Sequence, residues 1–273
     1  MSANSWKNLP QDTKFSKKKF LELVYTFLRF SLFIIPILGL SYYFYKSDLV
    51  KQPFRCLYFA SDGTLNKSWF VKHVELPFGK DLITIPLEKL KEDIIRYSQV
   101  SSVEITREFP SALHILIKEK MPCAKMMIVR KGKKVIGLIS SKGEIFSPIN
   151  YTRKAISEYP AITHVKKKLI ERKTILGFEA IEKLLSCLQL QAPDFYQNIT
   201  QISLEHFDPF LEKQWWTVDI LIQKRMTFTF SLNNVQSGLH KLRSILQALS
   251  PQQKKSLRRL DISLTNPVIE FEH

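Results

Sequence analysis

An uncharged apolar run near the N-terminus constrains this chain more than any other feature. The run covers Phe30–Tyr45 and reads FSLFIIPILGLSYYFY, with three tyrosines gathered at its end. A helix needs roughly 20 apolar residues to cross the hydrocarbon core of a bilayer. The run reaches that length when it is extended back to Val24, with the guanidinium of Arg29 reaching toward the headgroups. Tyrosine is typical of a membrane interface, so the sequence predicts a transmembrane helix over residues 24–45.

Two other interpretations of this run fit less well. A buried core helix would have a polar face and would not adjoin a basic tail. A cleaved signal peptide would have a shorter basic region and a small-x-small cleavage site after Tyr45. The basic cluster Lys14–Lys19 precedes the run, and such clusters stay on the cytoplasmic side. We therefore expect a single-pass inner-membrane protein, with residues 1–23 as a cytoplasmic tail and the bulk of the chain in the periplasm.

The charge of the chain is strongly basic. It has 41 Lys and Arg against 25 Asp and Glu, a formal net charge of +16. The excess is spread along the sequence, which indicates general attraction to anionic surfaces such as a membrane, or a solvated basic surface. No helix-turn-helix, zinc-finger or RNA-binding motif occurs. The sequence therefore predicts contact with a membrane but not with nucleic acid, and a membrane-bound DNA or lipid binder has only the net charge in its favour.

A β-hairpin is the clearest folded element after the span. Apolar residues alternate with polar ones on both sides of Phe109-Pro110-Ser111: Val103 and Ile105 before it, and Leu113, Ile115 and Ile117 after it. Alternation with β-branched residues predicts half-buried strands. Proline suits the turn because its φ is fixed and it lacks an N–H group.

The residues before this hairpin predict a small α+β domain. Phe54–Ala60 resembles a strand, and Thr64 is a candidate N-cap for a helix that begins at Leu65. A strand over Phe70–Leu76 is the competing interpretation. A second helix follows, with apolar residues from Leu87 to Tyr97. The expected order is β-α-α-β-β, with a linker at 46–53 and the domain at 54–123.

The remainder, residues 124–273, predicts a mainly antiparallel β domain with flanking helices. A helix should begin near Gly177 and another should cover Ser237–Leu249. The expected strands are Met126–Arg130, Val135–Ser140, Ile199–Leu204, Trp215–Gln223, Met226–Leu232, Leu260–Leu264 and Val268–Phe271. Trp215 and Trp216 are adjacent and should face opposite ways, so that one is a possible partner contact.

The hairpin and the segment after it carry a family resemblance. Their pattern resembles the last hairpin of the membrane-proximal POTRA domain in the FtsQ/DivIB cell-division proteins, which have one N-terminal span. The matching residues are Val100 or Val103, Arg107, Pro110, Leu113, Ile115, Ile117, Glu119, Pro122 and Ala124. The resemblance is specific here and looser over the rest of the chain. It implies a POTRA domain followed by the β domain.

The resemblance also implies a function. It implies a non-enzymatic scaffold at the division septum, which links early and late division proteins and binds FtsB/FtsL-type single-span partners and other divisome components. The family's contact lies on the last strands, where a partner strand extends the sheet, and this requires an unpaired edge. The candidate contact residues are Leu260, Ile262, Leu264, Val268, Ile269 and Phe271. Pro267 cannot donate a hydrogen bond and would restrict pairing to one side.

No catalytic, cofactor or metal site is predicted. The six histidines lack metal-binding spacing, the glycines form no phosphate loop, and Cys56, Cys123 and Cys187 lie far apart in the sequence. Glu205 and Asp208 stay open as an acid–base pair. The alternative function is therefore a membrane-anchored cell-wall enzyme or accessory factor, which would need a cleft with paired carboxylates or a Ser–Lys pair.

Overall fold

The computed structural model describes residues 17–46, 52–130, 132–223 and 225–272, with the side chains of 17–20 and 44–46 excepted. The predicted basic tail before Lys17 and most of the predicted linker lie outside these residues. Helix α1 (Lys17–Lys46) contains one stretch, Leu21–Tyr43, that is long and apolar enough to cross a membrane. A signal sequence has the same length and composition, so these two properties alone support only a candidate span.

The first folded unit is a three-stranded sheet with helices packed on it. In chain order it contains β1 (Cys56–Ser61), α2 (Lys67–His73), the 3-10 turn η1 (Leu82–Thr84), α3 (Leu87–Ile95), β2 (Val100–Glu108) and β3 (Ala112–Glu119). The strand order is β1-β3-β2, with β1 parallel and β2 antiparallel to β3. Trp69, Phe70, Leu90 and Ile94 of the helices are buried against the sheet.

The structure corrects two local predictions in this unit. The helix is capped by Asn66, whose side chain accepts the Trp69 N–H at 2.8 Å, whereas the predicted cap Thr64 donates its hydroxyl to the Ile149 carbonyl at 2.8 Å. The competing strand at Phe70–Leu76 is wrong, because helix α2 carries Phe70 into the core and ends at His73.

Arg107, one of the residues that carry the family resemblance, connects β2 to η1 through hydrogen bonds. Its Nε donates to the Leu82 carbonyl at 2.9 Å, and its Nη2 donates to the carbonyls of Ile85 at 2.7 Å and Ile83 at 3.2 Å. Several donors in a fixed geometry are what arginine offers and lysine does not. The side chain therefore satisfies three carbonyls of an irregular segment that lacks regular helix or sheet partners.

The second unit is a nine-stranded sheet that is covered on one face by helices. Its strand order is β14-β13-β12-β11-β10-β7-β4-β5-β6. The strands are β4 (Pro122–Arg130), β5 (Lys133–Ser140), β6 (Ile145–Phe146), β7 (Ala161–Thr163), β10 (Ile199–Ser203), β11 (Thr217–Ile222), β12 (Met226–Ser231), β13 (Leu257–Asp261) and β14 (Val268–Phe271). The helices are α4 (Arg153–Glu158), α5 (Phe178–Gln191), α6 (Pro193–Gln197), α7 (Val235–Ala248) and α8 (Pro251–Ser256), and the short elements are η2 (Lys167–Leu169), β8 (Ile170–Glu171), β9 (Thr174–Ile175) and η3 (Lys213–Trp215).

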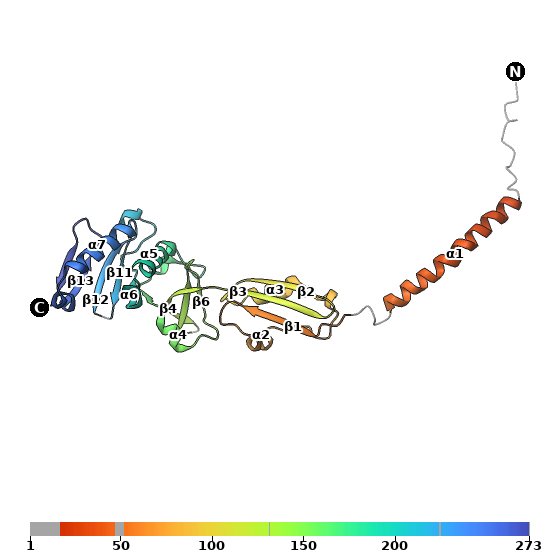
Figure 1. The fold of residues 1–273 in the computed structure, drawn as a ribbon, viewed down its shortest axis with the longest axis horizontal. Helices are drawn as coiled ribbons and strands as arrows, with labels where there is room; N and C mark the ends of the chain where they lie inside the picture. The colour runs from red at the N-terminus through yellow and green to blue at the C-terminus, as the bar shows by residue number, and fades with distance from the viewer. Residues whose placement is uncertain (1–16, 47–51, 131, 224, 273) are drawn as a thin grey trace, which may run out of the picture.

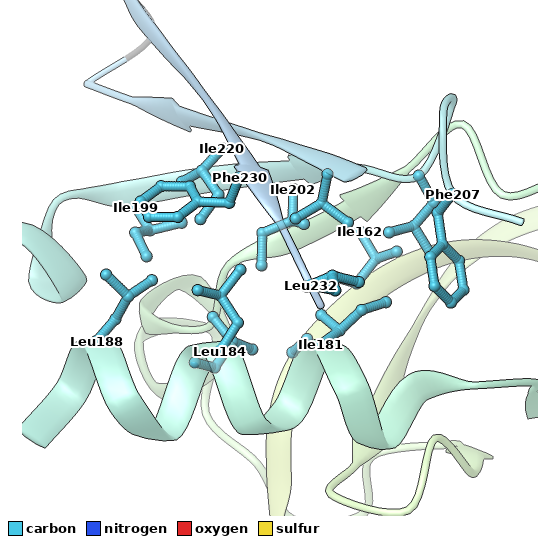
Figure 2. Close-up of a cluster of buried hydrophobic side chains, with 14 of the residues drawn as sticks. Ile162, Ile181, Leu184, Leu188, Ile199, Ile202, Phe207, Ile220, Phe230 and Leu232 are labelled. Atoms are coloured by element: carbon cyan, nitrogen blue, oxygen red, sulfur yellow. The ribbon is translucent and has the colours of Figure 1, made fainter. Parts of the chain in front are cut away.

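Helix α5 supplies much of the core of this unit. It begins after Gly177, whose φ of +70° is a conformation that glycine adopts readily. Figure 2 shows its side chains Ile181, Leu184 and Leu188 directed at the sheet. The sheet residues facing them are fully apolar and include Ile162, Ile199, Ile202, Ile220 and Phe230.

The sheet is mixed rather than simply antiparallel. Strand β7 is parallel to both β4 and β10, and β12 is parallel to β13, while the other neighbouring pairs are antiparallel. Helices lie in the connections between these parallel neighbours, as parallel pairing requires a crossover. The two units follow one another directly, because β3 ends at Glu119 and β4 begins at Pro122 (Figure 1).

The last two predicted strands are shifted in part. β14 coincides with the predicted Val268–Phe271, but the strand predicted at Leu260–Leu264 covers Leu257–Asp261. The reason is helix α8, which was not predicted. Ser250 and Gln253 form a capping box at its start, and the chain enters β13 directly from its last turn. Similarly, β11 begins at Thr217 rather than Trp215, because η3 occupies Lys213–Trp215.

A buried polar cluster joins the two units. One carboxylate oxygen of Glu119 accepts from Ser61 Oγ at 2.6 Å and from the Leu65 N–H at 2.7 Å. The other accepts from Gln99 Nε2 at 2.5 Å and lies 3.3 Å from Thr64 Oγ1. Gln99 is fully buried, and its Oε1 accepts the N–H of Ile149, a residue of the second unit, at 2.7 Å. The cluster satisfies every acceptor of a buried carboxylate while linking two folded units.

Burial alone would raise the pKa of the Glu119 carboxyl. The hydrogen bonds from Ser61, the Leu65 N–H and Gln99 outweigh that effect and hold its pKa below the ordinary value of 4.5. Glu119 therefore carries its charge at neutral pH despite being buried.

Candidate protein-interaction edge

The C-terminal strand β14 reaches the end of the sheet through a tight turn after β13. The Asp261 carboxylate accepts the N–H of Ser263 at 2.9 Å and its hydroxyl at 2.6 Å. The carbonyl of Leu264 accepts from Lys241 Nζ, on helix α7, at 2.6 Å. Pro267 then precedes β14. These contacts anchor the turn and return the chain antiparallel to β13, with Leu260 opposite Ile269 and Asp261 opposite Val268.

The hydrogen bonds around β13 show which backbone groups of β14 face outward. Ile262 donates its N–H to Thr229 on β12 at 3.1 Å, and Glu272 donates its N–H to Ser256, on the β13 side, at 2.7 Å. Successive residues of a strand alternate in direction. Val268 and Glu270 therefore face β13. The backbone N–H and C=O groups of Ile269 and Phe271 face the open edge.

This edge has no strand beside it among the described residues, and its surface is partly apolar. β14 ends the nine-stranded sheet, with β13 as its neighbour. Val268 is 48 % exposed and Ile269 is 37 % exposed, while Phe271 is partly buried against the core. Glu270 lies opposite Arg259. An extended segment placed here could pair with the backbone and cover exposed apolar area at the same time.

The six predicted contact residues lie in three different environments. Val268, Ile269 and Phe271 lie on the edge strand. Leu260 and Ile262 are buried beneath it, and β13 is paired on both sides, so their side chains support the edge without facing a partner. Leu264 is exposed but lies in the turn rather than on a strand.

The other residues singled out from the sequence are scattered over the fold. Trp215 is exposed, whereas Trp216 packs edge-on against Phe207. The three cysteines are free thiols, and burial raises the pKa of Cys123 to about 12. Within the described ranges, no group of three or more His, Cys, Asp and Glu side chains is arranged to hold a metal.

The open acid–base pair lies outside the three surface grooves considered below. Asp208 forms an ion pair with Lys168 and accepts the N–H of Phe210 at 3.1 Å, and the bond from Lys168 lowers the pKa of Asp208. Three surface grooves have walls made of described residues, and none of them includes Glu205, Asp208 or two carboxylates.

In a comparison with known proteins, no family model and no curated protein matches the chain.

Sequence reasoning located the edge strand but not the direction of its amides. The sequence indicates that Val268–Phe271 is a strand, in which successive residues point their backbone amides in opposite directions. Which of these amides face outward depends on the neighbouring strand. The one sequence signal for helix α8 was Ser-Pro-Gln-Gln at Ser250–Gln253, a capping pattern that would have moved β13 to its observed place.

Proposed function

We propose that this protein is a non-enzymatic scaffold of the bacterial division machinery, similar to FtsQ/DivIB. Helix α1 would anchor it in the inner membrane with the N-terminus in the cytoplasm. The three-stranded unit would act as a POTRA domain in the periplasm. The second unit would bind FtsB/FtsL-type single-span partners at the septum, through a strand added beside β14.

The open edge of β14 is the observation that carries this proposal. Its outward amides belong to Ile269 and Phe271, and no described residue supplies them with a backbone partner. The β-α-α-β-β element order of the first unit and the candidate span support the same assignment. So does the pattern that resembles this family, in which Arg107 makes part-buried and Glu119 buried structural hydrogen bonds.

Ile269→Pro tests the proposal most directly. The substitution removes an outward N–H, and proline is tolerated on edge strands, so the fold should persist. We expect binding to the purified ectodomains of FtsB/FtsL-type partners to weaken by about tenfold or more, since loss of main-chain pairing costs about 1.4 kcal/mol or more. Full-length protein in detergent and a titration by biolayer interferometry provide the measurement.

Ile269→Ala is the matched control. It keeps the outward N–H and removes only side-chain atoms, so its effect should be smaller than that of proline. Equal affinity for the wild-type protein and Ile269→Pro would count against the site. Hydrogen exchange in α5, which packs far along the sheet, checks that the fold is intact in both variants.

A further inference from the structure

A second open strand edge lies in the second unit, away from β14. Strand β4 pairs along its whole length with β5, but its pairing with β7 covers only Lys125 with Ala161 and Met126 with Ile162. Beyond Met126 the two strands diverge. Among the described residues, none offers a backbone partner to that side of Val129, the next residue that faces away from β5.

The direction of the β4 amides follows from two observations. Lys125 donates its N–H to the Pro160 carbonyl on the β7 side at 2.9 Å. Arg130 and Lys133 are paired at the tip of the hairpin. Alternation along the strand then turns the backbone groups of Met127 and Val129 toward the β7 side. The Met126–Ile162 pairing uses the Met127 N–H. The Met127 carbonyl and both backbone groups of Val129 therefore face the gap between β4 and β7 without a backbone partner among the described residues.

This gap is an apolar groove without acidic walls. It has a volume of about 350 Å³ and is lined by Lys125, Met126, Met127, Ile136, Ala161, Ile162, Thr163, His164 and Val165. Two apolar side chains beside the open edge are strongly exposed: Met127 is 58 % and Val129 is 73 % exposed. Exposed apolar residues next to free backbone groups are typical of a strand-binding site.

The charge around this edge has one sign. Between Lys120 and Gly143 the sequence contains no acidic residue, and its basic residues are Lys120, Lys125, Arg130, Lys131, Lys133, Lys134 and Lys142. Arg130, Lys133 and Lys134 are exposed at the end of the hairpin. An acidic segment is therefore favoured along β4, because its carboxylates would be attracted by these bases and a basic segment would be repelled.

We propose that the β4 edge, Met127–Arg130, binds an acidic, extended segment of another protein. The segment would pair with the Met127 carbonyl and with the N–H and C=O groups of Val129. Its apolar side chains would cover Met127, Val129 and Ile136, and its carboxylates would face Arg130, Lys133 and Lys134. The proposal rests on the geometry of β4 and is independent of the function proposed for β14.

Peptide binding to the full-length protein in detergent tests this site. The probe is a fluorescent eight-residue peptide of alternating Glu and Val. Its binding is measured by fluorescence anisotropy at low and high salt. The Glu/Val peptide should bind, and its affinity should fall as the salt concentration rises. The same peptide with alternate amides N-methylated, and a Lys/Val peptide, should each bind at least about tenfold more weakly.

Variants of the protein locate the binding. Val129→Pro removes an outward N–H, and the double change Lys133→Glu with Lys134→Glu reverses the local charge on exposed positions without touching the core. Each variant should bind the Glu/Val peptide about tenfold or more weakly than the wild-type protein. Val129→Ala keeps the amide and should have a smaller effect, and Ile269→Pro, at the other edge, should have none.

Several results would overturn the proposal. They are absence of Glu/Val binding, binding that survives both Val129→Pro and the charge reversal, and equal binding of the Lys/Val peptide. Phosphatidylglycerol vesicles could displace the peptide from the wild-type protein and bind the charge-reversed variant more weakly. That pair of results would assign the hairpin to an anionic lipid surface instead. Loss of binding in the Ile269→Pro variant alone would show that the peptide binds at β14 and not at β4.

Discussion

Replacing Glu119 by alanine is expected to destabilise the first unit by about 3 kcal/mol. The substitution removes a carboxylate that accepts from the Leu65 N–H at 2.7 Å and from Ser61 Oγ at 2.6 Å. It also leaves the amide of the fully buried Gln99 without its shortest hydrogen bond, which is 2.5 Å long. Buried donors that lose their acceptor cost more than the bond itself contributes.

Glu119→Gln should not rescue the protein. Both carboxylate oxygens act as acceptors, so either orientation of an amide places its NH₂ group against the Leu65 N–H or against the NH₂ group of Gln99, neither of which can accept a hydrogen bond. Gly63→Ala should also destabilise, because an added Cβ would lie 2.3 Å from the Glu119 side chain. Hydrogen exchange of peptides from β1, α2 and β3 in the full chain provides the measurement, and unchanged protection there would refute the role of the cluster.

The contribution of Glu119 should depend on pH. Since its pKa is lower in the folded state than the ordinary value of 4.5, folding favours the ionised form. Its stabilisation is complete above the unfolded-state pKa and is lost as the pH falls through the folded-state pKa. The difference in stability between the wild-type protein and Glu119→Ala should therefore shrink below pH 4.5. A difference that stays constant into that acid range would contradict the assignment.

Replacing Leu184 by alanine is expected to cost about 3 kcal/mol in the second unit. Leu184 is fully buried and points from α5 into the apolar face of the sheet (Figure 2). The neighbouring residues come from several strands, so the cavity cannot close without moving the sheet. Urea denaturation of the full chain, with hydrogen exchange in α5 to identify the unit that unfolds, provides the measurement.

Leu190→Ala provides a matched control on the same helix. Leu190 is 86 % exposed, so its truncation should change the stability by no more than about 0.5 kcal/mol. The two substitutions share any change in helix propensity, and their difference isolates burial. Similar effects of both substitutions would mean that α5 does not pack on the sheet as described.

Local pattern accounts for much of this fold. The alternation of Val103, Ile105, Leu113, Ile115 and Ile117 predicted β2 and β3, which pair around the Pro110 turn. Helix α5 begins after Gly177 as its periodicity indicated. These features depend on residues close together in the chain, and so a single sequence is sufficient to find them.

Some local predictions failed because a distant contact competed with the local preference. Thr64 had the properties of an N-cap, but its hydroxyl is used by Ile149 of the second unit. Leu264 lies in a turn held by Lys241 of α7 rather than on the predicted strand. The earlier start of that strand, at Leu257, has a local cause, which is the unpredicted helix α8.

The sequence by itself determined the candidate span, the basic character of the Lys120–Gly143 segment and the short apolar strand at the C-terminus, because each is a property of consecutive residues. Only the tertiary structure decided that β14 ends the sheet and that β4 and β7 diverge after Met126. It also decided that Ile269 and Val129 turn their amides to open edges. The physical reason is that a strand acquires an inner and an outer edge only through its neighbours, and hydrogen bonds to those neighbours set the phase of its alternating amides.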